Sequence, residues 1–413
     1  MYNFFCLRFP HIVESIFDQL SNESLVNCKE VSRYWNNILD DQVSFVEPKF
    51  LLMRKMVKLL KSKNQNRLIP KITKIATKIN SKTFQALEMA VYEFYEAQPD
   101  EAYSNSLLPA GFSISYDEGT TLIHIAAGSG NTELLRYFFE KNEDWLSKDS
   151  SGHVALHYAA QAGHLKACQY IIGKIEDKNP KNAMGETPLH YAASMGHLSI
   201  CTEIMEKVND KNPEDAKGTT PLHMAAIEGY TAICLAIMNQ LEDKSPKDNS
   251  GVTPLHSAAE RGQLQTYSAL MDQVEDVHPR DEDYWTPLHY VALGGDVLMC
   301  ELIIKNALEK NPSDTNGETP LHMAAVEGHF DVYKAIMDHV EDKNPKDIND
   351  WTPLHLAASN GFGRICELII ACVEDKNPIG HLYGPMQSAR ECWIEAESKV
   401  GTLEHQRILQ LFV

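Results

Sequence analysis

The sequence predicts an all-α protein with three short N-terminal helices, a helical linker, and an α-solenoid of eight 33-residue units that ends in a degenerate capping repeat. Two periodic series carry this prediction. One recurs every 33 residues as His124, His157, His190, His223, His256, His289, His322 and His355. The other has the same period and comprises Gly130, Gly163, Gly196, Gly229, Gly262, Gly295, Gly328 and Gly361. A fixed period kept without insertion is typical of stacked helical repeats.

Residues 1–45 predict a small domain of three short helices. Phe9-Pro10 opens a first helix with an apolar stripe, a turn with capping residues follows at 21–24, and a second stripe runs into the segment 31–35. A fragment of this size has little core of its own and usually docks on a partner. The alternative is a helical bundle that only covers the repeats.

This segment resembles an F-box, which begins with an apolar-Pro pair and ends with Val-Cys-Arg-x-Trp. It departs from that pattern in two ways: the spacing from Pro10 to Ile16 is one residue shorter, and Ser32 replaces the usual Cys. The resemblance implies binding to a Skp-type adaptor, which joins a cullin and a RING protein. The residues expected to meet the adaptor are Pro10, Ile12, Ile16, Leu20, Leu25, Val31 and Trp35.

Residues 46–115 predict a helical linker and an N-terminal cap for the repeats. Residues 52–60 carry one apolar stripe, and residues 84–97 have the apolar spacing of a helix that packs on the first repeat. Lysines also line one helix face, at Lys71, Lys74, Lys78 and Lys82. That face is either solvated or in contact with an acidic partner.

Residues 116–379 predict the eight repeats, and one unit explains the design. Gly185 permits a turn with positive φ, Thr187 is a helix N-cap whose hydroxyl can satisfy free N–H groups, and Pro188 sits at the first helical position. Gly196 ends this helix as a left-handed cap. A second helix follows over 198–205. A single pair cannot bury its apolar face, so neighbouring units must stack.

The unit resembles the ankyrin repeat, whose signature is Thr-Pro-Leu-His followed by Ala. Six units carry these four residues, whereas the first two depart from the signature, with Val154 in place of the capping Thr in the second. That loss should cost about 1 kcal/mol locally. Residues 380–413 are expected to form a degenerate capping repeat, because Glu395 and Lys399 replace small or apolar positions.

The repeated histidines could form a metal ladder or a structural column. One His per unit leaves neighbours about 10 Å apart, whereas zinc bonds are about 2 Å long, which favours the structural role. The ankyrin resemblance implies that each His hydrogen-bonds backbone between units. Five cysteines share one 33-residue slot with Leu and Tyr, and this mixture indicates packing thiols rather than disulfides or a metal site. We therefore expect no metal and no cofactor.

The residue after each His varies and is often Tyr or Met, which are adaptable contact residues. The family uses its concave side, made of the turn tips and first helices, to bind proteins. We expect a substrate to contact Tyr158, Tyr191, Met224, Trp285, Tyr290, Met323 and Trp351. The alternative is that several of these side chains only fill gaps between units.

The distribution of charge along the chain limits the kinds of partner that the protein can bind. The net charge of -19 divides into +7 over residues 1–82 (14 basic, 7 acidic) and -26 over the remainder (24 basic, 50 acidic). An acidic body argues against nucleic acid and anionic membranes. No apolar run reaches the roughly 18–20 residues needed to span a bilayer, and no signal peptide is expected. Together with reduced thiols, this predicts an intracellular, cytoplasmic protein, with the nucleus as the alternative.

No phosphate-cradling loop, paired Cys-x-x-Cys site or nucleophile elbow occurs, so an enzyme is not expected. The two resemblances together imply the substrate-receptor subunit of an SCF-type (Skp–cullin–F-box) ubiquitin ligase. Its F-box would dock the Skp adaptor and its repeats would hold the substrate. The alternative is an ankyrin-repeat scaffold or tethering protein without a ubiquitin role.

Overall fold

The computed structural model describes residues 121–132, 135–136, 139, 145–381, 386–400 and 402–412. The predicted F-box-like domain 1–45, the linker 46–115 and all seven predicted adaptor contacts lie outside these residues.

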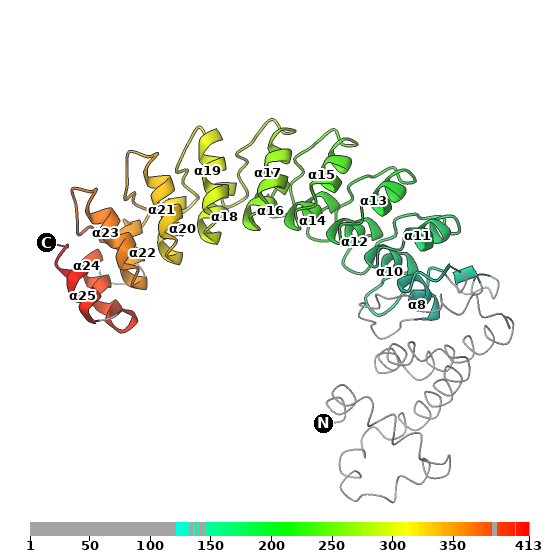
Figure 1. The fold of residues 1–413 in the computed structure, drawn as a ribbon, viewed down its shortest axis with the longest axis horizontal. Coiled ribbons are helices and arrows are strands. Elements are labelled where there is room, and N and C mark those ends of the chain that lie inside the picture. The colour runs from blue at the N-terminus through cyan, green and yellow to red at the C-terminus, as the bar shows by residue number, and fades with distance from the viewer. Residues whose placement is uncertain are drawn as a thin grey trace, which may run out of the picture. The chain divides into compact units, whose positions relative to one another are not determined.

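The described chain is built of helix pairs (Figure 1). First helices alternate with second helices along the sequence, and each pair occupies one 33-residue unit. The first helices are α8 (Leu122–Gly128), α10 (Ala155–Gln161), α12 (Pro188–Ser194), α14 (Pro221–Ile227), α16 (Pro254–Glu260), α18 (Pro287–Gly294), α20 (Pro320–Glu327) and α22 (Pro353–Asn360). The second helices are α11 (Leu165–Ile172), α13 (Leu198–Met205), α15 (Thr231–Met238), α17 (Leu264–Met271), α19 (Val297–Asn306), α21 (Phe330–Met337) and α23 (Gly363–Ile370). This confirms the predicted helical solenoid.

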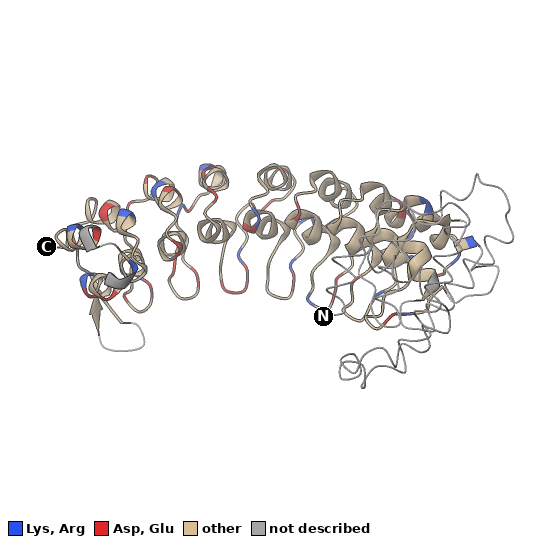
Figure 2. Ribbon diagram, turned by 60° about the horizontal axis from the view of Figure 1, so that its bottom comes forward, with Lys and Arg blue, Asp and Glu red and all other residues tan. Residues whose placement is uncertain are grey.

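The chain divides into two compact bodies. The first comprises residues 1–192 and 202–208, and the second comprises residues 193–201 and 209–413. Within the second body the first helices α14 to α22 pack side by side in one row, and the second helices form another row beside them (Figure 1). Long loops connect each pair to the next and project from one side of the rows (Figure 2).

The repeated Thr and His residues together cap the first helices, except at α10, where Val154 stands in the place of the Thr. At α14 the Thr220 backbone N–H donates to Nδ1 of His223 at 3.2 Å, and the Thr220 hydroxyl lies 2.9 Å from the same nitrogen. The hydroxyl therefore contacts the histidine ring, an arrangement that the expectation of a simple N-cap did not include. Pro221 occupies the first helical turn, where its missing N–H costs nothing.

The other ring nitrogen of the histidine links one repeat to the next. Nε2 of His223 lies 3.0 Å from the carbonyl oxygen of Val252, and Nε2 of His256 lies 3.1 Å from that of Trp285. The inter-unit backbone bond implied by the family resemblance is therefore present at these units, whereas Nε2 of His355 in the last repeat has no hydrogen-bond partner among the described residues. Because Nδ1 accepts from the Thr N–H, Nε2 carries the proton and donates to the carbonyl.

Glycine is required where first helices end. Gly196 has a φ of 78°, as predicted for a left-handed cap, and a Cβ there would stand 2.6 Å from the ring of Tyr230. The alanine pairs of the first helices are buried, and so are the apolar side chains of the second helices that face them. Small residues on one helix and large ones on the other let the rows approach closely.

The C-terminal segment closes the stack. A short antiparallel pairing of β1 (Ile379–Gly380) with β2 (Gln387–Ser388) leads into α24 (Ala389–Glu395), the 3₁₀ helix η4 (Ala396–Lys399) and α25 (Thr402–Leu409). Helices α24 and α25 pack on α22 and α23. Glu391 takes the histidine's place, because its Oε2 accepts the Ser388 backbone N–H at 2.7 Å. Glu395 and Lys399 are exposed, as expected of a capping repeat.

Candidate partner-binding surface

Aspartates recurring every 33 residues shape the loops that precede the first helices. In the second body, Oδ1 of Asp281 accepts the backbone N–H groups of Asp283 and Trp285 at 3.0 and 2.8 Å. Asp314 and Asp347 close their loops in the same way. Such side-chain turns fix the loop backbone.

Each loop tip is also hydrogen-bonded to the next. The Glu282 N–H donates to Ser250 O at 2.9 Å, and the Thr315 N–H donates to Asp283 O at 3.1 Å. The Ile348 N–H continues the series to Asn316 O at 2.9 Å. The tips of the second body therefore form a connected edge whose shape is set before any partner arrives. This edge and the adjoining side chains of the first helices are called the loop face below.

Three of the seven predicted substrate contacts are buried. Tyr158, Met323 and Trp351 are each no more than 5% exposed. Trp351 stacks on the ring of His355, with centroids 5.3 Å apart. For these three side chains the burial favours the gap-filling alternative, because little of each side chain is open to a partner. Four predicted contacts remain partly accessible: Tyr191, Met224, Trp285 and Tyr290.

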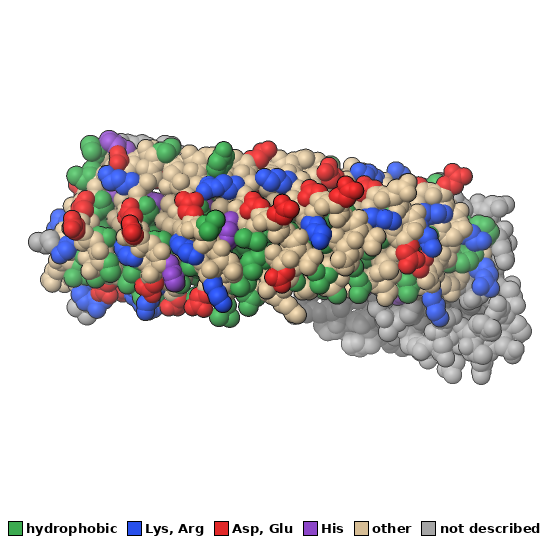
Figure 3. All heavy atoms as spheres, turned by 90° about the horizontal axis from the view of Figure 1, so that it is seen from above, with side chains coloured by type: hydrophobic (Ala, Val, Ile, Leu, Met, Phe, Trp, Pro, Cys, Tyr) green, Lys and Arg blue, Asp and Glu red, His purple; other side chains and the backbone are tan. Residues whose placement is uncertain are grey.

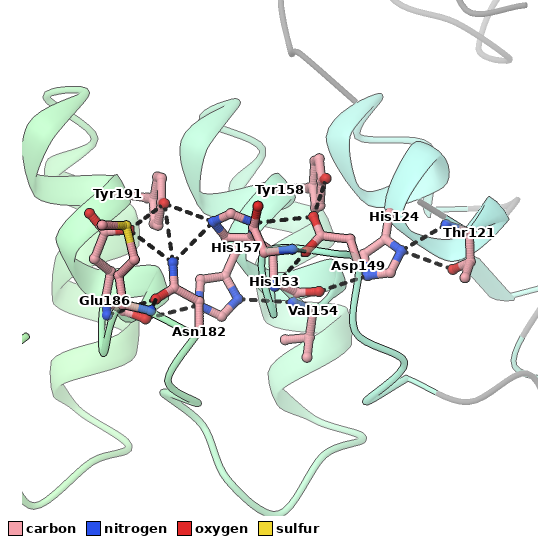
Figure 4. Close-up of polar contacts among 12 residues, drawn as sticks. Thr121, His124, Asp149, His153, Val154, His157, Tyr158, Asn182, Glu186 and Tyr191 are labelled. Atoms are coloured by element: carbon pink, nitrogen blue, oxygen red, sulfur yellow. Dashed lines mark hydrogen bonds and ion pairs between the residues drawn. The ribbon is translucent and has the colours of Figure 1, made fainter. Parts of the chain in front are cut away.

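In the first body, Tyr158 and Tyr191 belong to one polar network (Figure 4). The Tyr158 hydroxyl donates to Asp149 Oδ2 at 2.6 Å, and His153 Nδ1 lies 3.1 Å from the same oxygen. His153 Nε2 lies 2.8 Å from the hydroxyl oxygen of Tyr191, which donates to Glu186 Oε2 at 2.7 Å. The network thus ties two consecutive loops to two consecutive first helices.

The electrostatics of this network suit a structural role. Burial alone would raise the pKa of Asp149, but hydrogen bonds from the Tyr158 hydroxyl and from His153 outweigh it, and the pKa is lowered. Burial and the hydrogen bond to Glu186 raise the pKa of Tyr191, so its hydroxyl keeps its proton. Although an Asp–His pair is common in catalysis, here both ring nitrogens of His153 already face polar partners within the network. The arrangement positions Tyr191 at the surface.

A shorter version of this network lies in the second body. The Tyr290 hydroxyl donates to Asp281 Oδ2 at 2.8 Å, and the Trp285 indole N–H donates to Asp314 Oδ2 at 3.1 Å. The Trp285 ring stacks on His289, with centroids 5.6 Å apart. Both aromatic side chains are therefore held by polar groups while part of each ring stays accessible. Rigid aromatic groups of this kind contribute contact area at little entropic cost.

Sequence reasoning missed the polar partners of these aromatic residues. Asp149, His153, Asn182 and Glu186 carry the first network, and Asp281 and Asp314 carry the second. The signal for the aspartates was available, since Asp215, Asp248, Asp281, Asp314 and Asp347 share the 33-residue period. The second carboxylate oxygen of Asp281 contacts a first helix, and that of Asp314 contacts another loop. No periodicity reveals such contacts.

The cysteine column packs inside the second helices. Cys168, Cys201, Cys234, Cys300 and Cys366 are free thiols and buried. Burial raises the pKa of Cys201, Cys234 and Cys300 to about 12, so these thiols stay protonated and unreactive near neutral pH. Within the described residues, no cluster of three or more His, Cys, Asp or Glu side chains could hold a metal ion.

The outer surface carries no single kind of side chain. Acidic, basic and apolar groups are interspersed over the face that shows the second helices (Figure 3). Of the helices that the structure describes, none combines the length and the apolar character that crossing a bilayer requires.

The stacked helix pairs and their connected loop edge define an α-solenoid of the protein-binding class. A family model described as ankyrin repeats (3 copies) matches residues 100–182, 174–248, 199–281, 234–314, 255–347 and 299–380. These matches span well over half of the 413 residues, and the chain belongs to the ankyrin repeat family. An F-box domain model matches residues 7–47, which confirms the F-box resemblance of the N-terminal segment. No curated protein matches the chain. Both domains are interaction modules rather than catalytic ones.

Proposed function

We propose that this protein is the substrate-receptor subunit of an SCF-type ubiquitin ligase. The observation that carries the proposal is the pairing, in one chain, of an F-box at residues 7–47 with a long ankyrin solenoid behind it. F-box domains generally bind a Skp-type adaptor, and ankyrin repeats bind protein targets. A chain with both has one end for the transfer machinery and one end for a client.

The mechanism is positioning, and it needs no cofactor and no catalytic side chain. Binding a client close to the ligase raises the client's effective concentration at the transfer site, as linked binding sites do in general. A protein of this kind works inside the cell, in the cytoplasm or, as the alternative, in the nucleus. The proposed client contacts are the accessible Tyr191, Met224, Trp285 and Tyr290, while Pro10, Ile12, Ile16, Leu20, Leu25, Val31 and Trp35 are the proposed adaptor contacts.

Co-purification of the full chain with a recombinant Skp-type adaptor tests the proposal. The parent should retain the adaptor, and the double variant Ile16→Asp/Trp35→Ala should lose it, because a charge replaces one apolar contact and a large anchor is removed. The matched control is Leu298→Asp/Leu308→Asp, which changes two exposed apolar residues of the repeats. This control should bind as the parent does. A parent that retains no adaptor, or a double variant that binds normally, would favour the plain scaffold.

A further inference from the structure

Six carboxylates lie along the loop face of the second body without a basic partner. Within the described residues, no Lys or Arg forms an ion pair with any of them, and the loops that contain several of them carry much of the acidic colour in Figure 2. They are Asp248, Glu260, Asp281, Asp314, Glu318 and Asp347. Asp314 is only 8% exposed, so it adds negative charge beneath the face rather than a contact surface.

The basic residues of the same loops are engaged elsewhere. Arg280 pairs with Glu309 at 3.1 Å and also donates to Ser313 O at 2.8 Å. Lys346 pairs with Asp350 at 2.9 Å. Lys247 donates to the carbonyl oxygen of Arg280 at 3.0 Å. None of these three basic residues therefore forms an ion pair with the six carboxylates.

The closely spaced carboxylates shift the pKa values of the groups that lie between them. Burial, together with the charges of Asp314 and Asp347, raises the pKa of Glu318. Burial and the charges of Asp281, Glu260 and Asp248 likewise keep the Tyr290 hydroxyl protonated, since they raise its pKa. A cation placed on this face would relieve the repulsion between these carboxylates.

Large apolar side chains stand among these charges. Tyr284 is 55% exposed and Ile348 is 69% exposed, both at loop tips. Tyr284 has a φ of 68° at a position where the neighbouring units have Gly251 and Gly317, also with positive φ. A bulky residue is disfavoured in this conformation, and such strain persists only where the surrounding structure imposes it. Beside it, Trp285 and Tyr290 are partly exposed.

We propose that this acidic and aromatic part of the loop face, from Asp248 to Trp351, binds a Lys- and Arg-rich segment of a protein partner. Carboxylates would pair with the cationic heads, and the accessible parts of the Tyr284, Trp285 and Tyr290 rings would contact guanidinium or ammonium groups. The guanidinium carbon of Arg280 already lies 5.6 Å from the centroid of the Tyr284 ring, which shows that this ring suits a cation, and a partner would contact the part that Arg280 leaves open. The unneutralised negative charge selects a basic segment over nucleic acid or an anionic membrane. The inference rests on the proposed function insofar as this partner is the ligase client.

The test is fluorescence anisotropy with the full chain and a short fluorescein-labelled peptide rich in Lys and Arg. A counterpart peptide with Gln at every Lys and Arg is the probe control. The charge variant is Asp281→Asn/Glu318→Gln/Asp347→Asn. Its loops should fold normally, because Asn182 already occupies the aspartate position in an earlier unit and its Oδ1 accepts the backbone N–H groups of Met184 and Glu186 at 2.9 Å.

Two further variants complete the design. Glu242→Gln/Glu275→Gln/Glu341→Gln removes the same number of charges from exposed residues that follow the second helices. Tyr284→Gly removes the aromatic ring and installs the residue that this backbone conformation favours. We expect the parent to bind the basic peptide in a salt-sensitive manner and to ignore the Gln peptide. The charge variant should bind about tenfold more weakly, Tyr284→Gly severalfold more weakly, and the matched control like the parent.

Equal binding of both peptides would overturn the proposal, and so would equal losses in the charge variant and the matched control. The proposal would also be overturned if the parent protein did not bind the basic peptide and its mass, measured by light scattering at low salt, doubled. That result would assign the surface to a second copy of the chain. The peptide assay contains no adaptor, so a negative result in it does not change how the adaptor experiment is interpreted. A negative result in the adaptor experiment likewise does not affect the peptide assay.

Discussion

At the residue scale, the repeated Thr–His pair shows which contacts are essential and which are optional. Val154 replaces the threonine in the second unit, yet its backbone N–H still donates to Nδ1 of His157 at 3.1 Å. The helix cap therefore survives without the hydroxyl. What the second unit lacks is the contact between hydroxyl and ring that Thr220 makes with His223 at 2.9 Å.

Restoring the hydroxyl should stabilise this unit. Val154 is buried and close in shape to threonine, and the ring of His157 already stands where the hydroxyl partner lies in the other units. We expect Val154→Thr to raise the free energy of unfolding by about 0.5–1 kcal/mol. Urea unfolding followed by hydrogen exchange across 155–161 measures the gain where it occurs. Thr220→Val is the matched reverse change and should cost a similar amount, whereas a less stable Val154→Thr protein would contradict this account.

At the element scale, the helix pairs were predictable, but the surfaces of the helices were less so. The 33-residue period predicted each helix pair, the glycine that ends each first helix and the proline that begins most of them. These features depend on residues close in sequence. Burial of Tyr158, Met323 and Trp351 was not predictable, because the side chains of the next unit decide it. The network from Asp149 to Glu186 joins residues 37 positions apart through side chains alone. Tyr284, in contrast, could have been singled out as the large residue in a glycine series.

Each first helix also carries a buried histidine that links stability to pH. Burial lowers the pKa of His157 to about 3 and the pKa values of His289 and His322 to about 4. These values lie below the usual value of about 6.5, so the unfolded chain binds more protons in the interval between them. The histidine contribution is therefore complete above pH 6.5 and is lost as the pH falls toward 4.

We expect the urea midpoint of the repeats to fall between pH 7 and pH 5. The variant His289→Gln should be less stable at neutral pH, yet its free energy of unfolding should vary less steeply with pH. The difference in slope is at most about 1.4 kcal/mol per pH unit, the value for one fully titrating group. A midpoint that stays constant or rises on acidification would show that the histidines are not held neutral by burial.

At the scale of the whole molecule, a repeat protein transmits little from one end to the other. Each unit contacts only its neighbours, so stability is roughly a sum of unit and interface terms. The part of the loop face from Asp248 to Trp351 lies more than 200 residues along the chain from the F-box match. Two surfaces so separated in sequence can change independently, which suits a receptor that must keep its ligase contact while its client contact diverges.

The two proposed surfaces should accordingly fail one at a time. Ile16→Asp/Trp35→Ala should abolish adaptor binding and leave affinity for the basic peptide within about twofold of the parent value, because changes at distant, independent sites add. Asp281→Asn/Glu318→Gln/Asp347→Asn should weaken the peptide about tenfold and leave adaptor binding intact. Both affinities are measured on the same preparations of the full chain, with thermal melting of the repeats as the control for folding. If either variant impaired both activities without a change in melting, the surfaces would be coupled, and positioning by two separate contacts would no longer describe the protein.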